Sequence, residues 1–179
     1  MNSQQQVCLF VGRFQPFHNG HAAAVIHISQ YYERLVIAIS QAHISHVVTD
    51  PFTGGERYQM IKSFLESERL MSRADIIPIP IDATPTTWVP IIRSISPPFN
   101  IIYARSPLTQ SLFQYWGYEV VKNLHSGNLL SATEVRGAIS SRENWSELVP
   151  ESVASVIRNI DGIYRVKQML LGENHRLGG

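Results

Sequence analysis

Short apolar runs recur along this chain, and the stretches between them carry apolar residues at helical spacing. The first run, Val7 to Val11, is partly β-branched and ends at Gly12, which is typical of a buried strand. Later runs have the same character. The pattern predicts strands at residues 7–11, 35–40, 75–81, 100–104 and 118–121. Pro78 and Pro80 indicate that the third strand has free or bulged pairing.

The stretches between the strands predict helices. Thr53 and Glu56 have the spacing of a capping box, which predicts a helix start at that point. Helices are expected at residues 22–35, 56–67, 88–96 and 108–116, with two more after residue 143. Strands that alternate with helices predict an α/β fold: a Rossmann-like open parallel sheet of about five strands, with helices on both faces and further C-terminal helices. We expect residues 1–179 to form one domain.

Composition and charge mainly indicate what the protein does not bind or contain. The net charge is +1, so bulk electrostatics predict no binding to nucleic acid. No apolar run has the length of a membrane span, and the polar first residues lack the features of a secretory signal. The single cysteine, Cys8, excludes an internal disulfide framework. We therefore expect a cytoplasmic protein without membrane association.

The densest candidate chemistry follows the first strand. Gly12 and Arg13 lead into a loop with Pro16, and His18 and His21 then stand at the start of the next helix. A helix N-terminus offers free N–H groups and a partial positive charge, which suits a phosphate, and two imidazoles with an arginine strengthen that interpretation. Taken alone, a histidine at the start of a helix is usually an ordinary surface or structural residue.

Two other segments have both a structural and a functional interpretation. Ser131 and Glu134 form a capping box at an ordinary helix start, but the hydroxyls of Ser131 and Thr133 with Arg136 one turn later could also hold a phosphate chain. Trp88, at a junction between a loop and a helix, is either a core anchor or a platform on which an aromatic ring stacks. All these segments follow strand ends, so they should converge on one crevice at the carboxyl edge of the sheet.

The long loop after the second strand holds His43, His46 and Asp50. A zinc site there has little support, because no cysteine or carboxylate cluster accompanies the histidines. Long ordered loops often carry function, and His46 is a candidate phosphate contact.

Three stretches carry a family resemblance. GRFQPFHNGH at residues 12–21 resembles the first signature of the nucleotidylyltransferase superfamily, His-x-Gly-His, in the form found in archaeal-type nicotinamide mononucleotide (NMN) adenylyltransferases. SHVVTDPFTGGER at residues 45–57 is similar to the same enzymes, in which Ser-His and Asp-Pro-Phe-Thr-x-Gly-Glu-Arg recur. SATEVR at residues 131–136 resembles the second signature, commonly Ser-x-Thr-x-x-Arg.

The resemblance implies the reaction ATP + NMN → NAD + pyrophosphate, by direct attack of the NMN phosphate on the α-phosphorus of ATP. It implies catalytic roles for His18, His21, Arg13 and Arg136. The implied ATP-binding residues are Gly12, Arg13, Phe14, His18, His21, Ser131, Thr133 and Arg136, and the implied NMN-binding residues are Trp88 and His46. Mg²⁺ would be bound mainly by ATP oxygens rather than by protein ligands. ATP, NMN and NAD are the expected ligands, and a homo-oligomer is expected by analogy.

Four positions depart from the archaeal pattern: Thr49, where Arg is common; Pro85, where Asn is common; Arg105, within the segment that often reads Ser-Gly-Asn-Pro; and Ala132, where Gly is usual. Losing an arginine removes a charge-assisted phosphate contact, and losing an asparagine removes an amide that could recognise a carboxamide. Arg105 is a candidate to replace the missing phosphate ligand. The alternatives are therefore another adenylyl- or cytidylyltransferase of the superfamily, or a non-catalytic nucleotide-binding module. The choice between NMN and nicotinic acid mononucleotide stays open.

Overall fold

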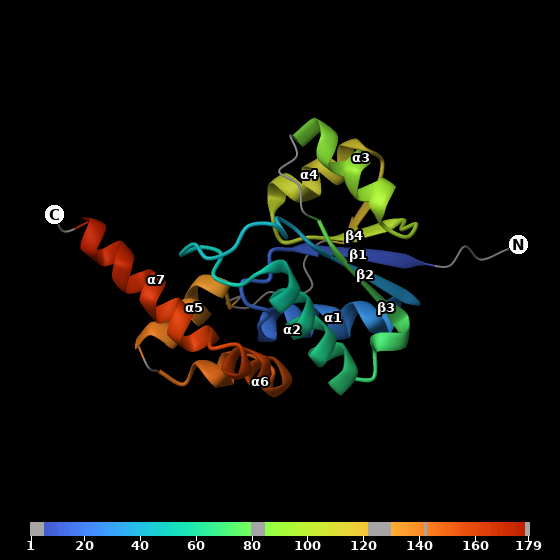
Figure 1. The fold of residues 1–179 in the computed structure, drawn as a ribbon. Helices are drawn as coiled ribbons and strands as arrows, with labels where there is room; N and C mark the ends of the chain where they lie inside the picture. The colour runs from blue at the N-terminus through green and yellow to red at the C-terminus, as the bar shows by residue number, and fades with distance from the viewer. Residues whose placement is uncertain (1–5, 80–84, 122–129, 142, 178–179) are drawn as a thin grey trace, which may run out of the picture.

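The structure, a computed structural model, describes residues 6–79, 85–121, 130–141 and 143–177. Its centre is a parallel sheet in the order β3-β2-β1-β4-β5, which confirms the predicted Rossmann-like class (Figure 1). The strands are β1 Val7–Gly12, β2 Arg34–Ile39, β3 Ala74–Pro78, β4 Ile101–Tyr103 and β5 Glu119–Val121. Because the chain starts in the middle of the sheet and fills one side before the other, the strand order reverses between β1 and β4.

Helices connect the strands and follow the last of them. They are α1 Asn19–Tyr31, α2 Gly54–Ser67, α3 Pro85–Ile95, α4 Pro107–Tyr115, α5 Ala132–Ser141, α6 Glu151–Asn159 and α7 Gly162–Leu177, with short 3₁₀ turns at Met71–Arg73 and Trp145–Leu148. Within the described ranges, no helix combines the length and the apolar character needed to cross a membrane.

The alternation of side chains along β1 divides the core into two layers. Cys8 and Phe10 point to one face, which helices including α1, α2 and α6 cover. Leu9 and Val11 point to the opposite face, where they pack with Val89 of α3 and with α4 (Figure 1). Both faces of the sheet are therefore buried, which is why the strands are continuous apolar runs rather than alternating ones.

Some element boundaries differ from the sequence prediction. Helix α1 ends at Tyr31, and the chain is already extended at Tyr32, because Arg34 must enter the sheet beside Val7. β3 ends at Pro78 on the edge of the sheet, where a missing N–H is tolerated; Pro80 and Ile81 lie outside the described residues. Helix α3 begins at Pro85, so Trp88 lies in its first turn rather than at its start.

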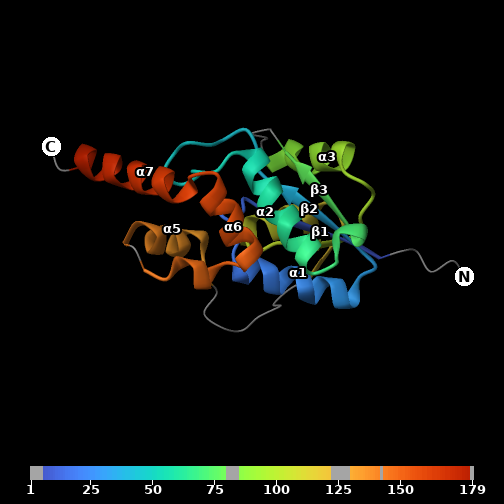
Figure 2. The same ribbon diagram turned by 60° about the horizontal axis from the view of Figure 1, so that its bottom comes forward.

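Helix α7 is joined to α2 and to the loop that precedes α2. Arg165 of α7 forms a bidentate ion pair with Glu56 of α2, with N–O distances of 2.6 and 2.8 Å, and also donates to the carbonyl of Pro51. Figure 2 shows α5, α6 and α7 gathered toward the carboxyl ends of the strands, with α7 extending away from the sheet. These helices therefore close the end of the molecule at which the candidate chemistry lies.

Candidate active site

A cavity of about 390 Å³ opens at the carboxyl ends of β1 and β4, where the strand order reverses. In open α/β sheets this is the place where ligands bind. The structure brings nine of the ten predicted site residues onto its lining: Gly12, Arg13, Phe14, His18, His21, Trp88, Ser131, Thr133 and Arg136. These residues come from segments far apart in the chain. The structure brings them together at the carboxyl edge of the sheet, as the sequence predicts.

The loop between β1 and α1 is compact and closely packed. A side chain at Gly12 would meet the ring of Phe14 at 2.8 Å, so the close approach requires glycine. Phe14 is almost fully buried, and its ring lies edge-on to His21 with centroids 4.8 Å apart. Gln15 exchanges two 2.9 Å hydrogen bonds with the backbone of Phe52. The hydrogen bonds to Phe52 thus fix the loop, and Phe14 contributes by packing against His21.

His18 and His21 cap the helix that they begin. The backbone N–H of Gly20 donates to His18 Nδ1 at 3.1 Å, and the backbone N–H of His18 donates to His21 Nδ1 at 3.2 Å. The two rings stack with centroids 3.7 Å apart. Since each Nδ1 accepts a hydrogen bond, the neutral tautomer of each ring carries its proton on Nε2. Both imidazoles can therefore donate a hydrogen bond to a phosphate oxygen.

Both histidines stay neutral near pH 7. Burial lowers the pKa of His18 to about 4; the positive charge of Arg105 adds to this effect, and Glu134 opposes it. The pKa of His21 lies well below its usual value because of burial, with smaller contributions from His18 and Arg105. Donation from neutral imidazole, rather than proton transfer from imidazolium, is therefore the chemistry available at this position.

Two predicted arginines are held differently. Arg136 is buried, and it donates to the carbonyl of Gln15 at 2.8 Å and to Thr133 Oγ1 at 3.3 Å. Arg13 is half-exposed and pairs with the buried carboxylate of Asp50 at 3.3 Å. Arg136 is therefore fixed in place, whereas Arg13 can turn toward an anion in the cavity.

The start of α5 confirms the predicted capping box. Glu134 accepts from the backbone N–H of Ser131 at 2.7 Å and from its hydroxyl at 2.6 Å, and Ser131 Oγ accepts from the N–H of Glu134 at 3.2 Å. Ala132 and Thr133, the first residues of the helix, also line the cavity. A helix N-terminus therefore faces the same space as the histidines and arginines.

Trp88 combines the two roles that the sequence left open. It packs against Phe113 with ring centroids 5.7 Å apart, which anchors α3 to α4. It also lines the cavity. An aromatic surface is thus available to a ligand on the α3 side of the cavity.

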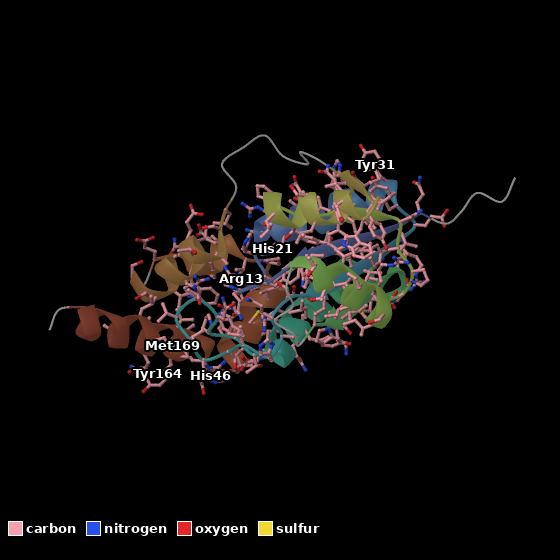
Figure 3. The ribbon with its side chains drawn as sticks, turned by 90° about the horizontal axis from the view of Figure 1, so that it is seen from above. Arg13, His21, Tyr31, His46, Tyr164 and Met169 are labelled. Atoms are coloured by element: carbon pink, nitrogen blue, oxygen red, sulfur yellow. The ribbon has the colours of Figure 1, made fainter. Side chains whose placement is uncertain are left out.

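His46 and Thr49 are not on the lining of the cavity. Both are exposed in the loop between β2 and α2; the ring of His46 lies 3.0 Å from Ser45 Oγ, and Thr49 donates to Asp50 at 2.7 Å. In Figure 3, His46 lies apart from Arg13 and His21. The predicted contact between His46 and NMN phosphate therefore has no support in this arrangement. Of the four departures from the archaeal pattern, Arg105 and Ala132 line the cavity, and Pro85 begins α3.

Sequence reasoning missed Arg57, the largest fully buried side chain of the described residues. Its guanidinium donates to the carbonyls of Arg13, Ser40, Gln41 and Ile44 at 2.9 to 3.2 Å. Burial lowers its pKa to about 10, which leaves it charged near pH 7. Arg57 thus ties the loop after β1 to the loop after β2. The recurring Gly-Glu-Arg at the α2 start was the available signal.

An α/β sheet of this order, with neutral and cationic donors and a helix N-terminus around its switch point, defines a Rossmann-like protein with a cavity suited to anions. A family model described as cytidylyltransferase-like matches residues 9–138. The chain therefore belongs to the cytidylyltransferase-like family.

Curated relatives agree with this assignment. A nicotinamide-nucleotide adenylyltransferase of Thermococcus kodakarensis is 39% identical over 163 residues, which are 90% of this chain and 87% of the relative. An enzyme of the same name from Methanococcus aeolicus is 38% identical over 162 residues, covering 90% of this chain and 93% of the relative. The resemblance to archaeal-type enzymes is confirmed, and nucleotidyltransferase is the enzyme class of these relatives.

Solved structures support the fold. A bifunctional NMN adenylyltransferase/ADP ribose pyrophosphatase from Francisella tularensis, complexed with AMP and a manganese ion, matches with a TM-score of 0.68 at 20% identity. The match covers 96% of this chain, which spans about half (53%) of the Francisella chain. A Plasmodium falciparum nicotinic acid mononucleotide adenylyltransferase complexed with APC matches with a TM-score of 0.57 at 12% identity, over 89% of this chain and 97% of that one.

Proposed function

We propose that this protein is a nicotinamide-nucleotide adenylyltransferase that converts ATP and NMN into NAD and pyrophosphate. The observation that carries the proposal is the convergence of His18, His21, Arg13, Arg136 and the α5 N-terminus on one cavity at the switch point. These groups suit a polyphosphate, and the archaeal relatives named above carry this enzyme name at 38–39% identity.

The reaction requires positioning and charge stabilisation more than base catalysis. An oxygen of the NMN phosphate, already anionic, forms a bond to the α-phosphorus of ATP. The bond from that phosphorus to the bridging oxygen of the β-phosphate breaks, and its electron pair leaves with pyrophosphate. Because no proton must be removed from the nucleophile, the protein mainly orients both nucleotides and stabilises charge on the phosphoryl oxygens.

Each residue has a distinct part in this proposal. The Nε2–H groups of His18 and His21 donate to oxygens of the α-phosphoryl group as charge develops there. Arg136, rigidly held beside the α5 N-terminus, binds the β- and γ-phosphates with help from Thr133 and Ser131. Arg13 closes on the phosphates from the β1 side. Gly12 allows the close approach of Phe14, and Phe14 packs against His21.

Trp88 is proposed to stack on the nicotinamide ring of NMN. Trp88 lines the cavity from α3, and the phosphate-binding groups of α5 line the same cavity. A cationic pyridinium over an indole gains about 0.5–2 kcal/mol from cation–π attraction. His46 is left out of the proposed site, since its exposed position lies off the cavity.

Mg²⁺ is the proposed metal, carried mainly by the oxygens of ATP and by water. Among the described residues, no group of three or more His, Cys, Asp or Glu side chains is arranged to hold a metal ion. The cavity donors are imidazoles, guanidiniums, hydroxyls and backbone N–H groups, which are ligands for anions rather than for Mg²⁺. When bound to ATP, the ion would neutralise phosphate charge. Homo-oligomer formation and a cytoplasmic location stay predictions.

A pyrophosphate-release assay tests the proposal. ATP and Mg²⁺ are supplied with NMN, nicotinic acid mononucleotide, phosphopantetheine or FMN in separate reactions, and NAD formation is followed in parallel. Release with NMN together with NAD formation is the expected result. Release only with another acceptor would move the protein to a different transferase activity. ATP binding without release for any acceptor would favour a non-catalytic nucleotide-binding module.

A further inference from the structure

The cavity contains a third arginine, Arg105, which comes from the other side of the switch point. It follows β4 by two residues, and β4 pairs with β1 so that Tyr103 lies opposite Phe10. Arg13 and Arg105 thus leave neighbouring parallel strands and line the same cavity from two loops. A ligand in this cavity would therefore meet positive charge from both loops.

Within the described part of the chain, Arg105 is tethered through one nitrogen. Its Nη1 donates to the carbonyl of Leu130 at 3.0 Å, the residue just before the Ser131 cap of α5. Arg13 has the carboxylate of Asp50 as its counterion, but within the described ranges no carboxylate forms an ion pair with Arg105. Among the described residues, the other guanidinium donors of Arg105 have no hydrogen-bond acceptor, so they are available to a ligand. Glu134 of the α5 cap interacts with Arg105 electrostatically: hydrogen bonds from Ser131 lower the pKa of Glu134, and the charge of Arg105 adds to this effect, but Glu134 and Arg105 do not form an ion pair.

The charge of Arg105 acts on the centre of the cavity. It lowers the pKa of both His18 and His21, so the guanidinium is electrostatically coupled to the two imidazoles that are proposed to face the α-phosphoryl group. The tether to Leu130 holds it at the same time beside the α5 N-terminus. It therefore lines the same cavity as the imidazoles and is held next to the helix that, with Arg136, is proposed to bind the β- and γ-phosphates.

We propose that Arg105 is a further phosphate-binding residue, whose guanidinium binds non-bridging oxygens of the β- and γ-phosphates of ATP and stabilises the departing pyrophosphate. This inference rests on the proposed nucleotidyl transfer for its catalytic part, but the binding of polyphosphate by Arg105 is independent of which acceptor is used. A guanidinium presents its N–H groups as a fork that matches two oxygens of a phosphate, and such charge-assisted bonds are the strong ones. Negative charge grows on pyrophosphate as it leaves, so Arg105 contributes to both ATP binding and turnover.

Three substitutions separate the charge of Arg105 from its tether. Arg105→Ala removes both, Arg105→Gln removes the charge but keeps an amide donor for the Leu130 carbonyl, and Arg105→Lys keeps the charge without the fork. Arg93→Ala is the matched control, because Arg93 is an exposed arginine of α3 that is not on the cavity lining. Thermal melting of each variant establishes that the fold is intact before binding is compared.

The first measurement is calorimetric binding of MgATP and of magnesium pyrophosphate to the full chain. Arg105→Ala and Arg105→Gln should weaken both by about ten- to hundredfold, the loss of one charge-assisted contact. Arg105→Lys should recover part of the affinity, and Arg93→Ala should bind like the wild type. In the activity assay, the KM for ATP should rise and kcat should fall, while the KM for NMN stays within about twofold. An NMR titration should find a higher pKa for His18 in Arg105→Ala.

The possible results are distinguishable. If Arg105→Ala and Arg105→Gln bind ATP and pyrophosphate as tightly as the wild type, the inference is overturned. If Arg105→Gln binds normally and only Arg105→Ala is weak, the tether matters rather than the charge, which also overturns it. If the wild type makes no NAD but loses polyphosphate affinity on losing Arg105, the proposed function fails while the phosphate-binding role of Arg105 is retained.

Discussion

Two hollows of equal size lie at opposite ends of the same sheet, and only one of them resembles an active site. Each encloses about 390 Å³. The hollow at the amino ends of the strands is lined by Arg34 and Asp75, which pair with each other at 2.9 Å, and by Asn100, which accepts from the backbone of Val7. Its charged and polar groups satisfy one another, so little remains to bind a ligand.

The cavity at the carboxyl ends is built differently. Arg105 forms no ion pair with a carboxylate among the described side chains, the imidazoles of His18 and His21 offer protonated Nε2 atoms, and the N-terminus of α5 faces inward. In a parallel sheet with connecting helices, helix N-termini gather at the carboxyl end of the strands, so positive potential gathers there too. Volume does not distinguish the two ends; the hydrogen-bond donors and positive charges on the lining of the carboxyl-end cavity do.

Replacing His18 should have the largest effect on activity. His18→Ala removes a donor aimed at the reacting phosphoryl group, and such a loss lowers kcat by about 10²–10³-fold. It also removes the α1 cap, which costs about 1 kcal/mol of stability. Rates of pyrophosphate release and urea unfolding curves measure the two effects. Full unfolding of the variant would instead mean that the histidine is mainly structural.

Arg57→Ala should be the most destabilising substitution around the cavity. It leaves backbone carbonyls of the loops after β1 and β2 without their donor, at a cost of about 3 kcal/mol. Urea unfolding provides the measurement, with Arg69→Ala, an exposed arginine, as the control. A change in unfolding free energy below about 1 kcal/mol would show that water replaces the guanidinium easily.

The free energy of unfolding should depend on pH through His18 and His21. The pKa of His18 is about 4 in the folded protein and near 6.5 when unfolded, so between these values the unfolded chain binds more protons. Unfolding free energy should therefore fall as pH drops from 6.5 toward 4, by at most about 3 kcal/mol from His18, with a loss of the same sign from His21. Denaturant unfolding at several pH values measures this. His18→Gln should flatten the profile, and an unchanged slope in that variant would contradict the assignment.

Trp88→Ala should act on one substrate only. Loss of the stacking surface should raise the KM for NMN by about two- to thirtyfold, from the 0.5–2 kcal/mol of a cation–π contact, with little change for ATP. Trp88→Phe keeps an aromatic face and should recover most of the affinity. Equal KM values for NMN in the wild type and the alanine variant would leave Trp88 as a core anchor alone.

The smallest effect on stability and activity should come from a substitution in the hollow at the amino ends of the strands. Arg34→Ala breaks the ion pair with Asp75, which is partly exposed at both ends, so it should cost less than about 1 kcal/mol and leave kcat and KM unchanged. Steady-state kinetics and thermal melting test this. A marked loss of ATP affinity would contradict the distinction between the two ends of the sheet.

Much of the architecture was readable from local signals. Thr53 and Glu56 cap α2 as their spacing predicted, Ser106 caps α4, and Gly117 follows its end with φ of 81°. The apolar runs became strands, and the segments after them converged as parallel topology requires. Periodicity and capping depend on residues within a few positions of each other, so a linear sequence contains the whole signal.

The burial of particular polar side chains was not readable in this way. Arg57 stands next to a capping glutamate and looks like a surface residue, but four carbonyls from two distant loops surround its guanidinium. Asp50 is buried because Arg13 and Thr49 pair with it, whereas His46, four residues earlier, is exposed. Such differences depend on which loops meet in space.

The sequence by itself determined the α/β class and the approximate positions of the elements, because apolar periodicity, caps and glycines act locally. It also contained the two segments, residues 12–21 and 131–136, that resemble the superfamily signatures. Only the tertiary structure decided that Arg105 joins Arg13 and the histidines, that His46 stays outside, and that the two imidazoles stack and remain neutral. Those outcomes follow from the pairing of β1 with β4 and from burial at the switch point, which are properties of contacts between residues far apart in the chain.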